Sequence, residues 1–187
     1  MSEIYFSKFN VTKQVFYKSK HTYAVVNLRP LVRGHVLVVP LRTNTPRLSD
    51  LSPEESIDYM QVLQVIHRFI MHVYKADSLN ISIQDGPESG QSVPHLHTHI
   101  LPRYKTDGHG DELYGKIEAI DFEKYAEEFQ IRKSNFLASA AKFKDQIPED
   151  SQRSNRTEEV MHKEAEWLAE ELEKFLPTLN PNDVVIP

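Results

Sequence analysis

Five short runs of β-branched and aromatic residues, each bounded by turn residues, predict the strands of a sheet. These runs cover residues 15–17, 22–28, 35–41, 80–84 and 96–101. Only residues 29–34 separate the second run from the third, and Gly34 can adopt backbone conformations that are closed to other residues. We therefore expect these two strands to pair antiparallel through a hairpin-type connection.

A long helix is predicted between the third and fourth of these strands. Ser52 offers a capping hydroxyl, Pro53 suits the first helical position, and Glu55 can bind the amide of the capping residue. Apolar residues then recur at steps of three and four, which places them on one stripe of a helix. The predicted stripe, expected to cover one face of the sheet, consists of Ile57, Met60, Leu63, Ile66, Phe69, Ile70 and Val73.

A second amphipathic stripe predicts a C-terminal helix that ends at Pro177. Its members are Val160, Trp167, Leu168, Leu172, Phe175 and Leu176. The pattern as a whole predicts an α+β fold, with an antiparallel sheet, one long amphipathic helix and a C-terminal helix. We expect one compact domain over residues 1–115, a variable and partly mobile segment over 116–159, and the C-terminal helix and tail over 160–187.

Composition narrows the classes of function. The 187 residues include nine histidines and no cysteine, and the formal net charge is −5. Without cysteine, disulfides, thiolate nucleophiles, cysteine zinc fingers and iron–sulfur clusters are excluded. The negative charge argues against general binding to nucleic acid or to an anionic membrane. The chain start has no signal-peptide pattern and no run reaches about 18 apolar residues, so we expect an intracellular protein, in the cytoplasm and also in the nucleus.

Three histidines at alternate positions carry the candidate chemistry. If His95, His97 and His99 lie on a strand, their imidazoles project from one face. Leu96, Thr98 and Ile100 then pack on the opposite face. Packing three adjacent imidazoles on one face is costly without a purpose, so the pattern indicates a functional site.

Two chemical interpretations of this row remain open. In the first, neutral imidazoles bind a catalytic zinc ion and leave one position for water. His95 and His99 lie roughly 13 Å apart along a strand, since each residue rises about 3.3 Å, so three ligands do not easily reach one ion. In the second, the middle imidazole attacks an electrophile such as phosphorus, while its neighbours orient it and stabilise charge.

The segment before the histidines favours phosphorus. It brings Gln84, Gly86, Gly90, Gln91 and Ser92 together directly after a predicted strand. Amide and hydroxyl donors, with backbone N–H groups made accessible by glycine, can bind phosphate oxygens without the lysine of a P-loop, whose pattern is missing. An acidic protein can therefore still bind a highly anionic ligand at this segment.

The chain resembles the histidine triad family of nucleotide hydrolases and transferases, and within it the fragile histidine triad branch, the diadenosine triphosphate hydrolases. The H-x-H-x-H motif is formed by His95, His97 and His99. The similarity covers most of the chain except about 115–150, and includes the C-terminal helix. The other matching segments are Asn27, Arg29-Pro30, Gly34-His35-Val36-Leu37-Val38, Pro40-Leu41-Arg42, Gln84-Asp85-Gly86-Pro87-Glu88, Gly90-Gln91-Ser92-Val93 and Leu101-Pro102-Arg103.

Two other branches of the family fit less well. Galactose-1-phosphate uridylyltransferases carry Gln at the position of His99. The small purine phosphoramidases end in a Trp-Pro-Pro-Gly segment that this chain lacks.

The resemblance implies a role for each residue of the site. His97 would attack the α-phosphorus and form a covalent nucleotidyl-histidine that water hydrolyses, with its other ring nitrogen held by a backbone carbonyl near His95. His99 would contact the phosphate and help the leaving nucleotide depart, supported by His95 and His35. The implied substrate contacts are Gln84, Gly90, Gln91, Ser92 and Val93 for phosphate, Asn27 for ribose, Tyr5 for the base, and Lys8, at a position where the branch often has His.

The resulting hypothesis is a hydrolase that cleaves diadenosine triphosphate to AMP and ADP. A divalent cation, Mg²⁺ or Mn²⁺, would bind through the substrate phosphates, with no metal ligands from the protein and no tightly bound cofactor. The family resemblance implies a homodimer. Two alternatives remain open: a zinc hydrolase, and a nucleotide-sensing interaction protein whose ligand-bound form signals to a partner. The second is motivated by the charged segment 143–159 and the loop 104–115.

Overall fold

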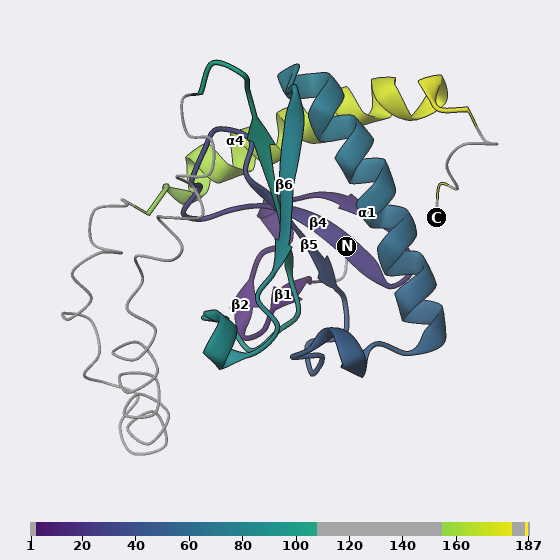
Figure 1. Cartoon of the computed structure of the whole chain (residues 1–187), viewed down its shortest axis with the longest axis vertical. Helices are drawn as coiled ribbons and strands as arrows, with labels where there is room; N and C mark the ends of the chain where they lie inside the picture. Colours follow the sequence, from purple (N-terminus) through teal and green to yellow (C-terminus); the bar gives the residue numbers. More distant parts are fainter. Residues whose placement is uncertain (1–2, 108–154, 181–185, 187) are drawn as a thin grey trace.

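The computed structural model describes residues 3–107, 155–180 and 186. Its centre is a five-stranded antiparallel sheet in the order β3-β4-β5-β7-β6 (Figure 1). A two-stranded hairpin, β1-β2, lies beside the sheet. The strands are β1 (Tyr5–Phe6), β2 (Phe9–Asn10), β3 (Val15–Lys18), β4 (Thr22–Val26), β5 (Val36–Pro40), β6 (Ser78–Ile83) and β7 (Thr98–Arg103).

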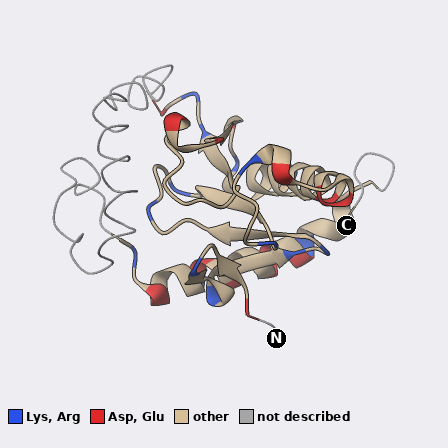
Figure 2. Cartoon of the chain, turned by 90° about the horizontal axis from the view of Figure 1, so that it is seen from below, with Lys and Arg blue, Asp and Glu red and all other residues tan. Residues whose placement is uncertain are grey.

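Alternating residues of the central strands divide the core into two parts. On one face, Ala24 and Val38 pack with apolar side chains of α1 (Pro53–Tyr74) and α4 (Glu158–Phe175). On the other face, Val25 and Val39 pack with residues next to the β1-β2 hairpin. Charged residues lie mainly on the helices and connecting segments of the ribbon (Figure 2). The sequences of β4 and β5 contain none. The predicted α+β class, antiparallel sheet and two helices are confirmed.

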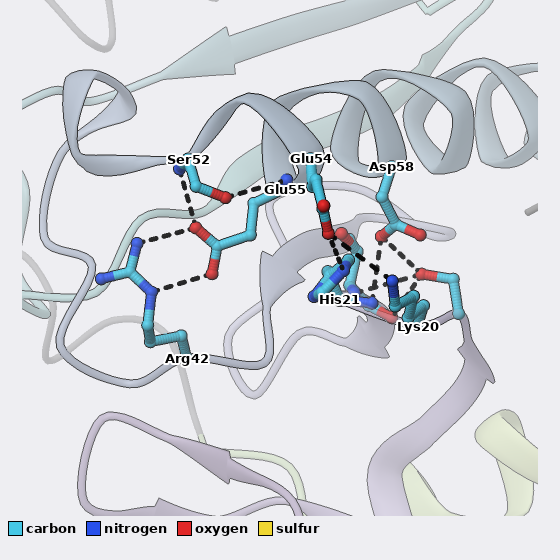
Figure 3. A network of polar contacts seen from close by, with 9 residues as sticks. Lys20, His21, Arg42, Ser52, Glu54, Glu55 and Asp58 are labelled. Carbon is cyan, nitrogen blue, oxygen red and sulfur yellow. Dashed lines mark hydrogen bonds and ion pairs between the residues drawn. The ribbon is translucent and has the colours of Figure 1, made fainter.

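The start of α1 follows its sequence signals. Ser52 Oγ accepts a hydrogen bond from the Glu55 amide at 3.2 Å, and the Ser52 amide donates to Glu55 Oε2 at 2.8 Å (Figure 3). Pro53 occupies the first helical position. This reciprocal arrangement satisfies two amides that the helix itself leaves without partners.

The predicted apolar stripe of α1 is partly wrong. Ile57 and Met60 are 61% and 54% exposed. The buried face instead includes Tyr59 and the polar residues Glu55 and Asp58. It is rotated from the predicted stripe because both carboxylates have partners from other segments, which makes their burial tolerable. The predicted members Ile66, Phe69 and Ile70 are buried, and Leu63 and Val73 pack partly buried against the core.

The C-terminal helix needs a similar correction. Val160 is 51% exposed and Trp167 is 37% exposed, while Met161 and Ala165 are buried in their place. The helix α4 ends at Phe175 and continues as a short 3₁₀ helix, Leu176–Thr178, that contains Pro177. The predicted segment 116–159 lies outside the described residues except for 155–159. In the described part of the chain, no helix combines the length and apolar character needed to cross a membrane.

Candidate active site

The four histidines of the site meet where β5 and β7 pair. Leu37 lies opposite His99 and Val36 lies opposite Ile100, so His35, directly before β5, is a diagonal neighbour of His99. The strand β7 begins only at Thr98, so His95 and His97 precede it rather than lying on a strand as predicted. The alternation nonetheless holds, because Leu96, Thr98 and Ile100 are all buried and two of them belong to the core beneath α1.

His97 has the tautomer that a nucleophile requires. Its Nδ1 lies 2.8 Å from the carbonyl oxygen of His95 and donates to it, because a carbonyl can only accept. In a neutral ring, this leaves the lone pair on Nε2. Burial lowers the pKa of His97, against the opposing effect of the His95 carbonyl, so the ring is neutral at pH 7. The carbonyl contact implied by the family resemblance is confirmed.

A hydrogen-bond relay sets the tautomer of His99. The Leu31 amide donates to Nδ1 of His35 at 3.1 Å, so a neutral His35 carries its proton on Nε2. That Nε2 lies 2.9 Å from Nδ1 of His99, which must accept, so His99 carries its own proton on Nε2. This Nε2 is buried and has no hydrogen-bond partner among the described residues. Burial lowers the pKa of His99 to about 3, so it is a neutral donor available to a ligand.

His95 is held by two residues that the sequence analysis did not identify. The Ser7 amide donates to Nδ1 of His95 at 3.0 Å, and the Phe6 ring centroid lies 5.6 Å from that of His95 and 5.2 Å from that of His97. Burial lowers the pKa of His95 to about 4, although the carbonyls of Pro40 and Arg42 oppose the shift. No sequence signal identifies these contacts, since Ser7 lies 88 residues before His95.

The loop before the histidines has a backbone conformation that depends on two glycines. Gly86 and Gly90 have φ angles of +118° and +86°, a region that favours glycine. A Cβ on Gly90 would lie 2.8 Å from Nε2 of Gln84, so the missing side chain lets the Gln84 amide approach the loop. Ser92 is exposed and Val93 is half-buried, at the end of the loop that leads into His95.

Gln91 is engaged within the protein. Its Nε2 donates to the carbonyl of Pro46 at 2.7 Å, and the residue is buried. The neighbouring Thr45 carbonyl accepts from the Leu96 amide at 2.7 Å, which joins the 45–46 segment to the histidine segment. The side-chain N–H of Gln91 therefore supports the loop, and its contact with phosphate stays a prediction.

The other predicted substrate contacts are Asn27, Tyr5 and Lys8, and of these Asn27 lies beside the histidines. Asn27 Nδ2 lies 3.1 Å from Nε2 of His35, so Asn27 borders the histidines. Tyr5 is 37% exposed and its hydroxyl donates to Glu3 at 2.6 Å, and Lys8 Nζ lies 5.6 Å from the centroid of the Phe9 ring. The hairpin reaches His95 and His97 through Phe6 and Ser7, and the substrate contacts of Tyr5 and Lys8 stay predictions.

Metal binding was the alternative chemistry for this row. Within residues 3–107, 155–180 and 186, no group of three or more His, Asp or Glu side chains is arranged to hold a metal ion. The Nδ1 atoms of all three triad histidines are already engaged, with the Ser7 amide, the His95 carbonyl and the His35 ring respectively. With these partners, neutral His95 and His99 carry their protons on Nε2, and His97 alone of the three presents an Nε2 lone pair, which fits the nucleophilic interpretation.

Comparison with known proteins agrees with this geometry. Residues 8–106 match the HIT domain family. A bis(5'-adenosyl)-triphosphatase of Saccharomyces cerevisiae is 52% identical, covering 92% of this chain and 93% of the relative. An asymmetrical bis(5'-nucleosyl)-tetraphosphatase of Schizosaccharomyces pombe is 41% identical, covering 92% and 98%.

A solved structure shows the same fold. The diadenosine triphosphate hydrolase of Plasmodium falciparum superposes with a TM-score of 0.65 at 23% identity, covering 93% of this chain and 86% of that one. The histidine triad and the matches to the domain family and to the fungal relatives agree with one another. The chain belongs to the HIT domain family.

Proposed function

We propose that this protein hydrolyses dinucleoside polyphosphates, and that diadenosine triphosphate is cleaved to AMP and ADP. The observation that carries the proposal is the hydrogen bond from His97 Nδ1 to the His95 carbonyl, which leaves the Nε2 lone pair for attack. The names of the two fungal relatives, a triphosphatase and a tetraphosphatase, support the substrate class.

The reaction proceeds in two steps through a covalent intermediate. Nε2 of His97 attacks the α-phosphorus, a P–N bond forms, and the bond from this phosphorus to the bridging oxygen breaks as ADP leaves. Water then attacks the same phosphorus, the P–N bond breaks and its electron pair returns to Nε2. The water proton passes to solvent, and AMP leaves.

His99 acts as a neutral hydrogen-bond donor in this mechanism. Its Nε2–H is buried and has no hydrogen-bond partner within residues 3–107, 155–180 and 186, and its pKa of about 3 keeps the ring uncharged at pH 7. A donor of this kind stabilises negative charge that develops on the leaving or non-bridging oxygens without first having to break a bond to another group. His35 fixes the proton on that nitrogen through the relay from Leu31.

The proposal includes a divalent cation, Mg²⁺ or Mn²⁺, bound through the substrate phosphates, where it offsets their charge. It also includes a homodimer. One edge of β6 has no strand partner among the described residues, and Ile81 on β6 is 43% exposed. Ile57 and Met60 on α1 are exposed apolar residues as well. Light scattering of the purified protein tests the dimer, and exhaustive chelation followed by readdition of Mg²⁺ tests the cation.

Labelled water tests the reaction itself. The protein is incubated in ¹⁸O-water with diadenosine triphosphate and, separately, with diadenosine tetraphosphate, and the products are analysed by mass spectrometry. Attack at the α-phosphorus predicts one ¹⁸O in AMP and none in ADP. Label in ADP instead would contradict the mechanism, and the ratio of the two rates defines the preference for phosphate number.

The alternative of a nucleotide-sensing interaction protein depended on residues 104–115 and 143–159. Only 104–107 and 155–159 of these lie within the described residues. No described contact favours this alternative, and it stays a prediction, as does the intracellular location.

A further inference from the structure

A segment from outside the matched domain lies against the turn that carries Asn27. The domain match ends at residue 106, yet the Arg156 amide donates to the Leu28 carbonyl at 3.2 Å. Nε of Arg29 donates to Oδ1 of Asn155 at 2.5 Å. Residues 155–156, which lead into α4, thus run along the turn between β4 and His35.

The Arg156 guanidinium makes a denser set of contacts with the same turn. Its Nε and Nη2 donate to the Asn27 carbonyl at 3.1 and 2.5 Å. Its Nη1 forms an ion pair with Glu164 on α4, and both side chains are only 19% exposed. Because a guanidinium is planar and its donors have fixed directions, contacts with two acceptors fix its orientation. Arg156 therefore connects α4 rigidly to the backbone of Asn27.

Asn27 in turn connects this contact to the histidines. Its Oδ1 accepts from the Arg29 amide at 3.1 Å, which fixes the plane of the side-chain amide. Its Nδ2 then lies 3.1 Å from Nε2 of His35, in a packing contact since both nitrogens carry protons, and His35 contacts His99. A displacement of the Asn27 backbone by a fraction of an ångström would therefore move an amide that borders the site.

We propose that Arg156 is a positioning residue that holds Asn27 for the ribose of the substrate, and so makes α4 part of the nucleotide-binding device. The inference rests on the proposed function, because the ribose contact of Asn27 is what the family resemblance implies for the substrate of that reaction. A clamp that only stabilises the fold would be the simpler explanation of the same contacts. The two differ in whether loss of Arg156 affects the ribose contact specifically.

Two substrates separate these explanations. The first is diadenosine triphosphate, and the second is its analogue without the 2'- and 3'-hydroxyls of the riboses. For Arg156→Gln we expect KM for the natural substrate to rise about tenfold, the equivalent of one ordinary hydrogen bond, with kcat within about twofold. For the analogue, which cannot make the ribose contact, KM is expected to be equal in wild type and variant.

Further variants serve as controls. Lys163→Gln removes an exposed ion pair with Glu159 on the same helix and is expected to leave both KM values unchanged. Arg156→Lys keeps one donor and is expected to fall between wild type and Arg156→Gln. Glu164→Gln leaves the Asn27 contact in place and should raise KM less than Arg156→Gln. If Arg156→Gln does not fold, the last two variants decide the question.

Two results would overturn the inference. One is an unchanged KM for the natural substrate in folded Arg156→Gln. The other is an equal rise in KM for both substrates, which identifies a purely structural clamp. Calorimetric Kd values for both ligands, in the His97→Ala background with and without Arg156→Gln, repeat the comparison without turnover. A wild type without activity would refute the proposed function, and these binding data would still decide the role of Arg156.

Discussion

Two polar clusters of this protein show how differently a fold can treat polar groups. The first, the helix-start cluster, consists of Arg42, Ser52 and Glu55 at the beginning of α1 (Figure 3). The Arg42 guanidinium donates to both Glu55 oxygens at 2.8 and 2.7 Å, and the Ser52 amide adds a third hydrogen bond at 2.8 Å. Arg42, ahead of the Ser52 contacts, lowers the pKa of Glu55 to about 2.

The second, the histidine cluster, consists of His35, His95, His97 and His99. Here burial, rather than a charged partner, dominates, and it lowers the pKa of His95 to about 4 and that of His99 to about 3. Nε2 of His99 is buried and has no hydrogen-bond partner among the described residues. His95, His97 and His99 are therefore neutral at pH 7, and His99 has a donor that the described part of the protein does not use.

The difference separates a stabilising cluster from a functional one. A buried carboxylate with all its oxygens bonded has no capacity left for a ligand, and its contacts contribute only to stability. A buried donor without a partner costs stability, and such groups persist where a ligand supplies the missing acceptor. Substitutions in the two clusters should consequently affect different properties.

The largest expected effect is on turnover. His97→Ala removes the nucleophile, and we expect kcat to fall about 10⁴-fold or more, as for other covalent catalysts. Substrate binding should persist, because the loop before the histidines and Asn27 are untouched. Steady-state kinetics measures the first quantity and calorimetry the second. Activity above a tenth of the wild-type value would exclude His97 as the nucleophile.

The two clusters should change the stability of the protein in different pH ranges. His95 and His99 have native pKa values of about 4 and 3, so below about 6.5 the unfolded chain binds protons that the native protein does not. Stability is thus expected to fall as pH drops from about 6.5 to 4, by at most about 1.4 kcal/mol per pH unit for each histidine. Glu55, with a lowered pKa, instead loses its contribution between about pH 4.5 and 2.

Urea denaturation at pH steps from 7.5 to 4.5 measures the stability change that the histidines cause. His99→Gln should reduce the slope of the free energy of unfolding against pH in this range, and Glu55→Gln should leave that slope unchanged. A slope that is the same in wild type and His99→Gln would show that His99 is not neutral in the native protein.

Disruption of the helix-start cluster should lower stability and spare catalysis. Glu55→Gln removes a carboxylate that is 8% exposed, and we expect the free energy of unfolding to fall by about 1–3 kcal/mol, with the exposure of Arg42 limiting the loss. Glu54→Gln is the matched control. The Glu54 side chain is 77% exposed, so this substitution should leave the denaturation midpoint unchanged. A large fall in kcat for Glu55→Gln would contradict the separation of the two clusters.

The sequence was sufficient for features with a local cause. The capping residues Ser52 and Glu55 predicted the first turn of α1, because both partners lie within one helical turn. The alternation of histidines with Leu96, Thr98 and Ile100 predicted which side chains enter the core. The family resemblance also predicted the tautomer of His97, whose partner, the His95 carbonyl, lies two residues away.

Features that depend on distant partners could not be predicted in this way. The apolar residues Ile57 and Met60 suggested a buried stripe, but Asp58 is buried instead because Ser19, 39 residues earlier, donates to it at 2.7 Å. Ser7, whose amide contacts His95, has a left-handed backbone with a φ of +55°. Serine has no preference for this conformation that would have predicted it. Periodicity records apolar character and carries no information on such long-range partners.

The smallest expected effect concerns the hydroxyl that joins the core to the segment carrying the histidines. Tyr59 on α1 donates to the Val38 carbonyl at 2.9 Å, and its oxygen lies 2.7 Å from Oγ1 of Thr98, between His97 and His99. Tyr59→Phe leaves Thr98 with one partner fewer, at an expected cost of about 1–2 kcal/mol in the free energy of unfolding. Denaturation of Tyr59→Phe, Thr98→Val and the double variant measures the coupling between the two hydroxyls.

Catalysis provides the sharper test of Tyr59. His97 and His99 are oriented by the His95 carbonyl and by His35, not by Thr98, so kcat/KM of Tyr59→Phe should stay within about threefold of wild type. A loss of a hundredfold or more would mean that the core beneath the strand positions the imidazoles. The histidine cluster would then depend on the hydrogen bond between Tyr59 and Thr98, on the face of the sheet covered by α1. The separation between stabilising and functional clusters would fail at Tyr59.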